Sequence, residues 1–289
     1  MQPLMRRLAI AILLLSMPEA FAAKPDTRPD ERRVYKTIGG VQLHVDLFKP
    51  ESVHPGDKRP AIVFFFGGGW LGGTPRQFHQ HAEAFAELGF VAISAEYRVI
   101  RTHKTTPFEC VADGKSVVRW IRQNAGELGV DPQRVVAAGG SAGGHVAACT
   151  ALIKGHESPG DDLTISSVPD ALILYNPVID TTARGYGLKQ VGEDRQTEIS
   201  PCHHVRKKLP PTLVFHGTGD KTVPFENAER FTRLMKDAGN DCRLVPFPGA
   251  VHGFFNGSVF RPKSDNKYFD RTMEEAKTFV SNLGLLRDL

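Results

Sequence analysis

The sequence has little of what would suggest a metal-binding or nucleic-acid-binding protein. No lysine or arginine run resembles a nucleic-acid patch, and no two histidines show the H-x-x-x-H spacing of a helical metal site. The cysteines are few, and their spacings match no zinc motif (Cys110, Cys149, Cys202 and Cys242). We therefore expect no metal, no other cofactor and no nucleic-acid partner.

The amino terminus has the pattern of a secretory signal peptide over residues 1–22. A basic start and an apolar run over residues 8–15 precede Ala20-Phe21-Ala22, an A-x-A cleavage site. A membrane anchor is the weaker interpretation, because spanning a bilayer needs ~20 apolar residues. We expect a secreted or periplasmic protein without membrane contact after cleavage. In that compartment the cysteines could pair, but the sequence gives no connectivity.

Beyond residue 33, strands and helices are expected to alternate without internal repeats. Residues 23–33 are charged and hold two prolines, so a disordered leader is expected there. The alternation favours one α/β domain whose mostly parallel central sheet carries helices on both faces. Strands are expected at 34–38, 41–48, 61–66, 91–95, 134–138, 171–175, 212–215 and 243–247, and helices at 77–88, 108–125, 146–152, 224–237 and 269–283.

Ser141 lies between two segments that the sequence predicts to be buried. The valine-rich strand over 134–138 precedes it, and the segment 146–152 is apolar nearly all round, as a buried helix is. Gly139-Gly140-Ser141-Ala142-Gly143 matches G-x-S-x-G, whose small residues permit a sharp strand-to-helix turn that exposes the serine. An ordinary loop serine is the alternative, but the flanking elements favour a nucleophile.

Two later strands are each followed by a residue that could activate this serine. A serine nucleophile needs a base and an acid that orients the base. Ligands bind beyond the carboxyl ends of parallel strands, where Asp220 follows strand 212–215 and His252 follows strand 243–247. The alternatives are a helix-capping role for Asp220 and Asp180 as the acid. The order Ser141, Asp220, His252 is that of the α/β-hydrolase triad.

The other histidines are expected to have other roles. His145 is predicted to pack on the helix after Ser141. Five others are predicted either near the site but out of triad order (His203, His204 and His216) or on the surface of a helix (His79 and His81).

On these residues the mature chain resembles α/β-hydrolase esterases and lipases, close to hormone-sensitive-lipase-like and carbohydrate acetylesterase-type exported bacterial esterases. The resemblance implies an α/β-hydrolase domain over residues 34–289. It also implies an oxyanion hole made by the backbone N–H groups of Gly68, Gly69 and Ala142. Such enzymes carry His-Gly-Gly-Gly where this chain has Phe66-Gly67-Gly68-Gly69. The replacement puts in doubt the hydrogen bonding that steadies this loop.

The resemblance implies an exported serine esterase for short acyl groups, acetyl-like or feruloyl, on small-molecule or carbohydrate alcohols. Trp70 is expected either to stack on a sugar ring or to pack against the oxyanion loop. The polar segment 180–208 is the only candidate lid, and no large cap domain is expected. A serine peptidase of the prolyl-oligopeptidase type and a non-catalytic hydrolase-fold binding protein are the alternatives. The oligomeric state has no sequence signal.

Overall fold

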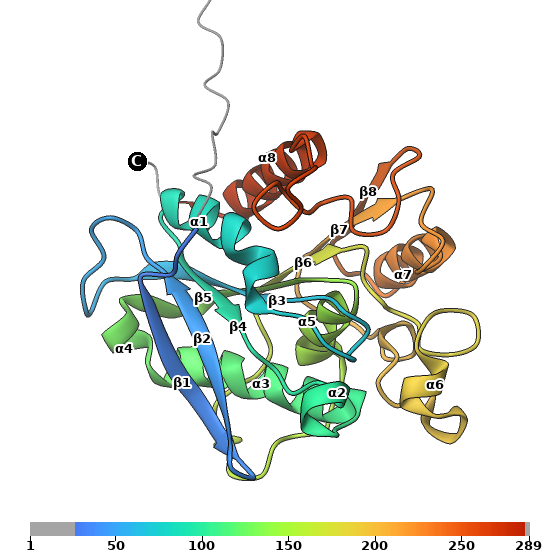
Figure 1. Cartoon of the computed structure of the whole chain (residues 1–289), viewed down its shortest axis with the longest axis horizontal. Coiled ribbons are helices and arrows are strands. Elements are labelled where there is room, and N and C mark those ends of the chain that lie inside the picture. The colour runs from blue at the N-terminus through green and yellow to red at the C-terminus, as the bar shows by residue number, and fades with distance from the viewer. Residues whose placement is uncertain (1–26, 287–289) are drawn as a thin grey trace, which may run out of the picture.

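The computed structural model describes residues 27–286, so the predicted signal peptide lies outside the described residues. One eight-stranded sheet forms the centre of the fold (Figure 1). Its strands follow the order β1-β2-β4-β3-β5-β6-β7-β8; β1, β2 and β4 pair antiparallel, and the remaining pairs are parallel. The strands are β1 Glu31–Ile38, β2 Val41–Phe48, β3 Arg59–Phe65, β4 Val91–Ala95, β5 Val130–Gly140, β6 Ala171–Tyr175, β7 Thr212–Gly217 and β8 Cys242–Phe247.

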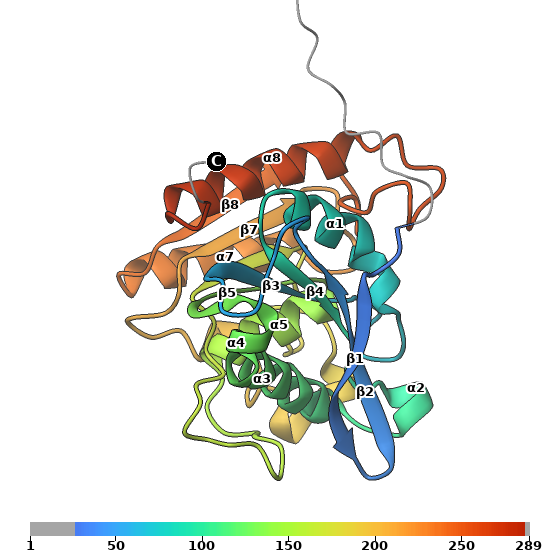
Figure 2. The same ribbon diagram turned by 90° about the vertical axis from the view of Figure 1, so that its left-hand side faces the viewer.

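Helices cover both faces of the sheet, as Figure 2 shows for α1 and α8 on one side and α3, α4 and α5 on the other. The helices are α1 His79–Glu87, α2 Ile100–His103, α3 Pro107–Gln123, α4 Ala125–Leu128, α5 Ala142–Leu152, α6 Leu188–Val191, α7 Phe225–Asp237 and α8 Lys267–Asn282. Three short 3-10 helices, Pro75–Phe78, Glu193–Arg195 and Pro201–His203, lie between these elements. The single α/β domain with a mostly parallel sheet is confirmed.

Strand β3 is apolar from Pro60 to Phe65 because both of its faces are covered. Val63 and Phe65 belong to the core shared with α3, α5 and α7, whereas Ile62 and Phe64 point into the core shared with α1 and α8. Successive side chains of a strand alternate between faces, so a strand covered on both sides needs apolar residues at every position. Burying each phenylalanine here contributes roughly 1.5–3 kcal/mol. The central strands therefore form a firm base for the loops at their carboxyl ends.

The predicted leader ends earlier than expected, because β1 begins at Glu31. Arg32 pairs with Asp46 at 2.6 Å, and Arg33 pairs with Glu127 at 2.7 Å. The charged residues therefore belong to the edge of the sheet, and the prediction of disorder was wrong for residues 31–33.

His79 and His81 were predicted on the surface, and this was wrong. His79 is 5% exposed, and its Nε2 lies 3.0 Å from Oδ2 of Asp46. His81 is fully buried beside the rings of Phe78 and Tyr175. The sequence predicts the helix α1, but it does not show that His79 and His81 face the sheet.

The cysteines are buried free thiols in the structure. No helix within residues 27–286 has both the length and the apolar character that crossing a membrane requires.

Candidate active site

Ser141 occupies the turn between β5 and α5 in a conformation that few non-glycine residues adopt. Its φ and ψ are 56° and −120°, which costs backbone strain. The Ser141 N–H donates to the carbonyl of Tyr175 at 2.9 Å. A Cβ on Gly143 would lie 2.1 Å from the carbonyl oxygen of Phe65, so this position accepts no side chain. The turn therefore holds the serine at the carboxyl edge of the sheet.

His252 joins Ser141 to Asp220 through its two ring nitrogens. Its Nε2 lies 2.9 Å from Oγ of Ser141, and its Nδ1 lies 2.7 Å from Oδ2 of Asp220. The other carboxylate oxygen of Asp220 accepts backbone N–H groups from Thr222 at 2.8 Å and Val223 at 3.0 Å. An ionised carboxylate can only accept a hydrogen bond, so Nδ1 of His252 carries the ring proton. Nε2 is then free to accept the serine proton.

Asp220 stays ionised although it is buried. Burial by itself raises the pKa of this carboxyl, but hydrogen bonds from His216, His252 and the Val223 N–H outweigh burial and hold its pKa well below the usual range. Nε2 of His216 lies 3.3 Å from Oδ2 of Asp220 and 3.0 Å from the carbonyl of Val223. A fixed negative charge therefore faces the histidine that contacts Ser141.

Asp180, the alternative acid, has different partners. Its Oδ2 pairs with Nη1 of Arg230 at 2.6 Å, and its Oδ1 accepts the Thr182 N–H at 2.9 Å. The contacts with His252 belong to Asp220 instead.

Apart from His216, the other histidines discussed above have side-chain partners away from Ser141 and Asp220. His145 lies on α5 and is fully buried, as expected. Burial lowers its pKa to about 4, although a hydrogen bond with the Ile199 carbonyl opposes the shift. The exposed His203 contacts Ser200. His204 contacts the carbonyl of Thr197.

The loop after β3 carries the predicted oxyanion donors Gly68 and Gly69. Gly68 has a φ of 129°, and a Cβ on it would lie 2.1 Å from the carbonyl oxygen of Gly72, so only glycine fits. The third predicted donor, Ala142, is the first residue of α5. Its N–H therefore has no acceptor within the helix. Ala142 directly follows Ser141, and the loop meets Ser141 at Gly67, so both predicted sources of N–H donors lie next to the serine.

Phe66 is held by Tyr97. The two rings stack with centroids 4.2 Å apart, and the Tyr97 hydroxyl donates to the Phe66 carbonyl at 2.6 Å. Both side chains are almost fully buried. At the position where the family pattern has a histidine, an aromatic stack and a tyrosine hydroxyl anchor the start of the loop.

Trp70 was predicted at the mouth of the site, and its proposed stacking on a sugar was wrong. The side chain is fully buried, with its ring centroid 5.0 Å from that of His145. A positive φ of 59° directs the chain so that the indole enters the core. The indole packs beside His145 and Tyr186, and packing against the oxyanion loop stays a prediction.

Tyr186, which no sequence motif indicated, approaches the oxyanion loop from segment 180–208. Its hydroxyl lies 2.7 Å from the point where a Cβ on Gly69 would stand. Its ring lies 6.0 Å from Trp70, and the residue is partly exposed. Five charged side chains of the segment are exposed, as its composition indicated (Arg184, Lys189, Glu193, Asp194 and Arg195).

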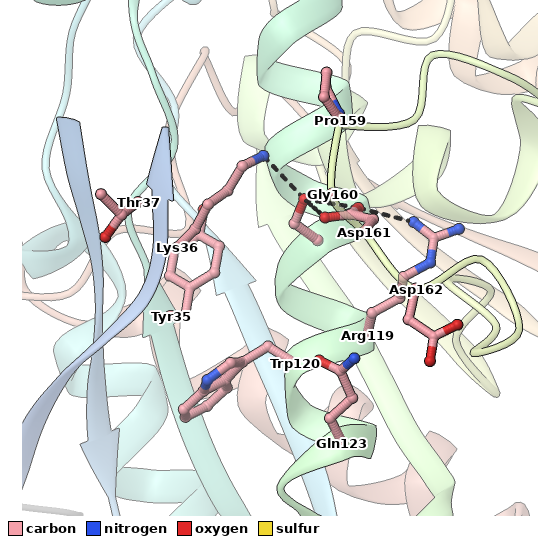
Figure 3. Close-up of a pocket in the computed structure, with 11 residues that line it drawn as sticks. Tyr35, Lys36, Thr37, Arg119, Trp120, Gln123, Pro159, Gly160, Asp161 and Asp162 are labelled. Atoms are coloured by element: carbon pink, nitrogen blue, oxygen red, sulfur yellow. Dashed lines mark hydrogen bonds and ion pairs between the residues drawn. The ribbon is translucent and has the colours of Figure 1, made fainter. Parts of the chain in front are cut away.

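A separate polar pocket of about 250 Å³ lies between β1, α3 and residues 159–162 (Figure 3). Its cations are neutralised by neighbouring carboxylates: Lys36 by Asp113 at 2.6 Å, and Arg119 by Asp161 at 3.2 Å. The predicted site residues are absent from its walls, which comprise Tyr35, Lys36, Thr37, Ser116, Arg119, Trp120, Gln123, Pro159, Gly160, Asp161 and Asp162. In the described part of the chain, no three His, Cys, Asp or Glu side chains are grouped to hold a metal ion.

Two family models match the chain. The BD-FAE model matches residues 45–183, and the dienelactone hydrolase family model matches residues 171–280. The first covers the oxyanion loop and Ser141, and the second covers Asp220 and His252.

Esterase 2 from Thermogutta terrifontis is similar over nearly the whole chain. Its structure phosphoramylated by tabun is 48% identical, has a TM-score of 0.86, and is aligned over 92% of this chain and 98% of that chain. Its propionate-bound structure is 46% identical, with a TM-score of 0.84 and coverages of 93% and 99%.

Curated relatives from Mycobacterium tuberculosis are more distant. Esterase LipQ is 27% identical over 78% of this chain, which spans 57% of the LipQ length. Carboxylesterase NlhH is 29% identical, over 82% of this chain and 80% of that protein.

The sheet order, the turn at Ser141 and the serine-histidine-aspartate contacts define the class of α/β hydrolases. Within that class, the 48% identity to a solved esterase over 92% of the chain is decisive. The chain belongs to the α/β-hydrolase esterases, which are carboxylic ester hydrolases.

Proposed function

We propose that the protein is an exported serine esterase that hydrolyses short-chain acyl esters, acetyl-like or feruloyl, of carbohydrates. The observation that carries the catalytic part is the hydrogen-bonded series Ser141, His252 and Asp220 beside the oxyanion loop. Export rests on the signal-peptide pattern of residues 1–22.

In the acylation step, Ser141 Oγ attacks the ester carbonyl carbon while Nε2 of His252 takes the hydroxyl proton. The carbonyl oxygen becomes an oxyanion and accepts the N–H groups of Gly68, Gly69 and Ala142. Asp220 holds the imidazole by its Nδ1–H and stabilises the imidazolium. When the tetrahedral intermediate collapses, the imidazolium gives its proton to the departing alcohol, which leaves an acyl group on Ser141.

In the deacylation step, water takes the place of the alcohol. Nε2 of His252 removes a proton from the water, whose oxygen attacks the acyl carbonyl carbon. The second intermediate forms against the same N–H donors, and Ser141 Oγ leaves with the proton from the imidazolium. The products are the carboxylic acid and the free enzyme, so the cycle uses only side-chain and backbone groups described above.

Two observations support a short acyl group on a hydrophilic alcohol. Esterase 2 from Thermogutta terrifontis has been solved with propionate bound. In this chain, segment 180–208 contributes Tyr186 beside the oxyanion loop and carries several exposed charged residues. A site that meets lipid would instead expose a contiguous apolar surface. Trp70 no longer supports the carbohydrate part, because it is buried.

Replacement of the nucleophile tests the catalytic part. Ser141→Ala should lower turnover of p-nitrophenyl acetate by roughly 10⁴- to 10⁶-fold. The exposed Ser281 on α8 provides the matched control, and Ser281→Ala should keep wild-type turnover. Wild-type turnover by the Ser141→Ala enzyme would refute the mechanism.

A substrate panel tests the finer part of the proposal. It comprises p-nitrophenyl esters of increasing chain length, acetylated xylan, methyl ferulate and an aminoacyl anilide. We expect kcat/KM to fall as the acyl chain lengthens, and we expect acetate release from xylan or hydrolysis of methyl ferulate. Activity confined to the anilide would indicate a peptidase, and inactivity throughout would indicate a binding protein.

A further inference from the structure

Two side-chain amides connect the oxyanion loop to the turn that carries His252. The N–H of Gly67 donates to Oε1 of Gln77 at 2.6 Å. Nε2 of Gln77 donates to Oδ1 of Asn256 at 3.0 Å, and Nδ2 of Asn256 donates to the carbonyl of Gly253 at 2.7 Å. Gly253 directly follows His252. The chain of hydrogen bonds, here called the amide bridge, spans segments far apart in the sequence.

The backbone groups at its two ends set the direction of the amide bridge. A backbone N–H can only donate and a backbone carbonyl can only accept. Gln77 must therefore accept at one end and donate at the other, and Asn256 must do the same. A carboxylate lacks the donor and a hydrocarbon lacks both groups, so carboxamides suit both positions. Asn256 is 1% exposed, which makes an unpaired amide there costly.

One end of the amide bridge lies against the nucleophile. A Cβ on Gly67 would stand 3.2 Å from the Cβ of Ser141, so the loop and the turn are in close contact at this point. Gly67 also directly precedes the predicted oxyanion donors. Its N–H is already taken by Gln77, so the bond fixes the loop without occupying those donors.

The other end of the amide bridge is fixed to the sheet. The N–H of Gly253 donates to Oδ1 of Asn176 at 2.9 Å, and the N–H of Asn176 donates to the carbonyl of Phe215 in β7 at 2.7 Å. Asn176 follows Tyr175, whose carbonyl accepts the N–H of Ser141. The histidine turn is thereby held between the oxyanion loop and the strand ends.

We propose that Gln77 and Asn256 are positioning residues that set the oxyanion loop and His252 at the separation needed for acyl transfer. They supply hydrogen bonding to a loop in which Phe66 replaces the family histidine. This role rests on the proposed esterase activity. Neither side chain touches the reacting atoms in this account; both act through Gly67 and Gly253.

The test uses Gln77→Met, Asn256→Leu and the double variant, with p-nitrophenyl acetate as substrate. Each single variant should lower kcat by about 10- to 100-fold, because small displacements of catalytic groups are costly. KM should stay within about threefold, since the bridge touches no substrate. The double variant should be no slower than the slower single variant, because either substitution already breaks the bridge.

Asn240→Leu is the matched control. Asn240 is a buried amide that also connects two backbone groups, the Leu209 N–H at 2.9 Å and the Arg206 carbonyl at 2.8 Å, away from Ser141. It should lower the melting temperature as Asn256→Leu does but keep kcat within about twofold. Gln77 is partly exposed, so its variant is expected to fold even if Asn256→Leu does not.

Wild-type kcat in a folded Gln77→Met enzyme would overturn the proposal. So would an equal loss of kcat in Asn240→Leu, because the loss would then follow stability. An active Ser141→Ala enzyme would refute the esterase mechanism itself. An inactive Ser141→Ala enzyme with normal Gln77 and Asn256 variants would refute the bridge alone.

Discussion

Asp220 and Asp180 follow neighbouring strands of one sheet, and both are buried with backbone N–H groups on one carboxylate oxygen. They differ in the partner of the second oxygen. Asp220 faces His252 at 2.7 Å, whereas Asp180 faces Arg230 at 2.6 Å. A histidine can take and return a proton near neutral pH, and an arginine cannot. The turn after each strand thus positions a buried carboxylate. The side chain that contacts its second oxygen, His252 or Arg230, determines what the carboxylate does.

The largest difference in turnover should come from Asp220→Asn. The amide can no longer hold His252 with its proton on Nδ1, so we expect kcat for p-nitrophenyl acetate to fall by about 10⁴-fold. Circular dichroism and thermal melting serve as the folding control. A loss of less than tenfold would show that Asp220 is not the orienting acid.

A smaller effect is expected at the second histidine of this cluster. His216→Phe removes the His216 contact with Asp220 but keeps a ring of similar size. We expect kcat to fall by about 10- to 150-fold, in line with roughly 1.5–3 kcal/mol for a hydrogen bond to a charged group. Steady-state kinetics measures the change. A loss as large as that of Asp220→Asn would mean that His216, and not only His252, is required for proton transfer.

Asp180→Asn should change kcat by less than about twofold while lowering stability. Arg230 is 27% exposed, so water screens part of the lost attraction, and we expect about 1–2 kcal/mol of destabilisation. Urea unfolding monitored by tryptophan fluorescence measures it. A fall in kcat comparable to that of Asp220→Asn would instead make Asp180 the acid.

The smallest effect on turnover is expected from a substitution of His81. Its comparison with His252 parallels that of Asp180 with Asp220. His252 has a partner at each ring nitrogen, whereas neither nitrogen of His81 has one, and burial lowers the pKa of His81 from 6.5 to about 3. The unfolded chain takes up this proton as pH falls below 6.5, but the folded chain does not until about pH 3. The contribution of His81 to the free energy of unfolding is therefore complete above pH 6.5 and is lost as the pH falls from 6.5 to about 3.

His81→Leu should therefore make the protein less sensitive to acid. Its unfolding free energy should fall by about 2 kcal/mol less than that of the wild type between pH 7 and pH 5. Urea unfolding at the two pH values gives the difference. Identical pH dependence in both proteins would show that the buried histidine does not govern acid stability.

The main elements of the site follow from local sequence. Valine-rich β5 and the small residues around Ser141 permit few structures other than a strand-turn-helix. Asp220 and His252 come directly after strands, and parallel strand ends meet at one edge. These features are local in the chain, and the topology brings them together without further information.

The features that the sequence did not reveal depend on contacts between distant segments. Trp70 follows glycines that suggest an open loop, but its positive φ turns the indole into the core. His79 on α1 turns inward to meet Asp46 of β2. The contact between Gln77 and Asn256 joins residues that neither a motif nor a periodicity connects. Glu31 was assigned to a leader because charge alone does not distinguish a solvated tail from an ion-paired sheet edge.

Covalent labelling tests most directly the claim that Ser141, activated by His252, is the nucleophile. The protein is incubated with paraoxon, digested and analysed by mass spectrometry while residual p-nitrophenyl acetate hydrolysis is followed. The account predicts one diethylphosphoryl group on the peptide that contains Ser141, with activity lost in proportion to its occupancy. Full labelling of Ser141 with activity retained, or inactivation by labelling at another residue, would contradict it.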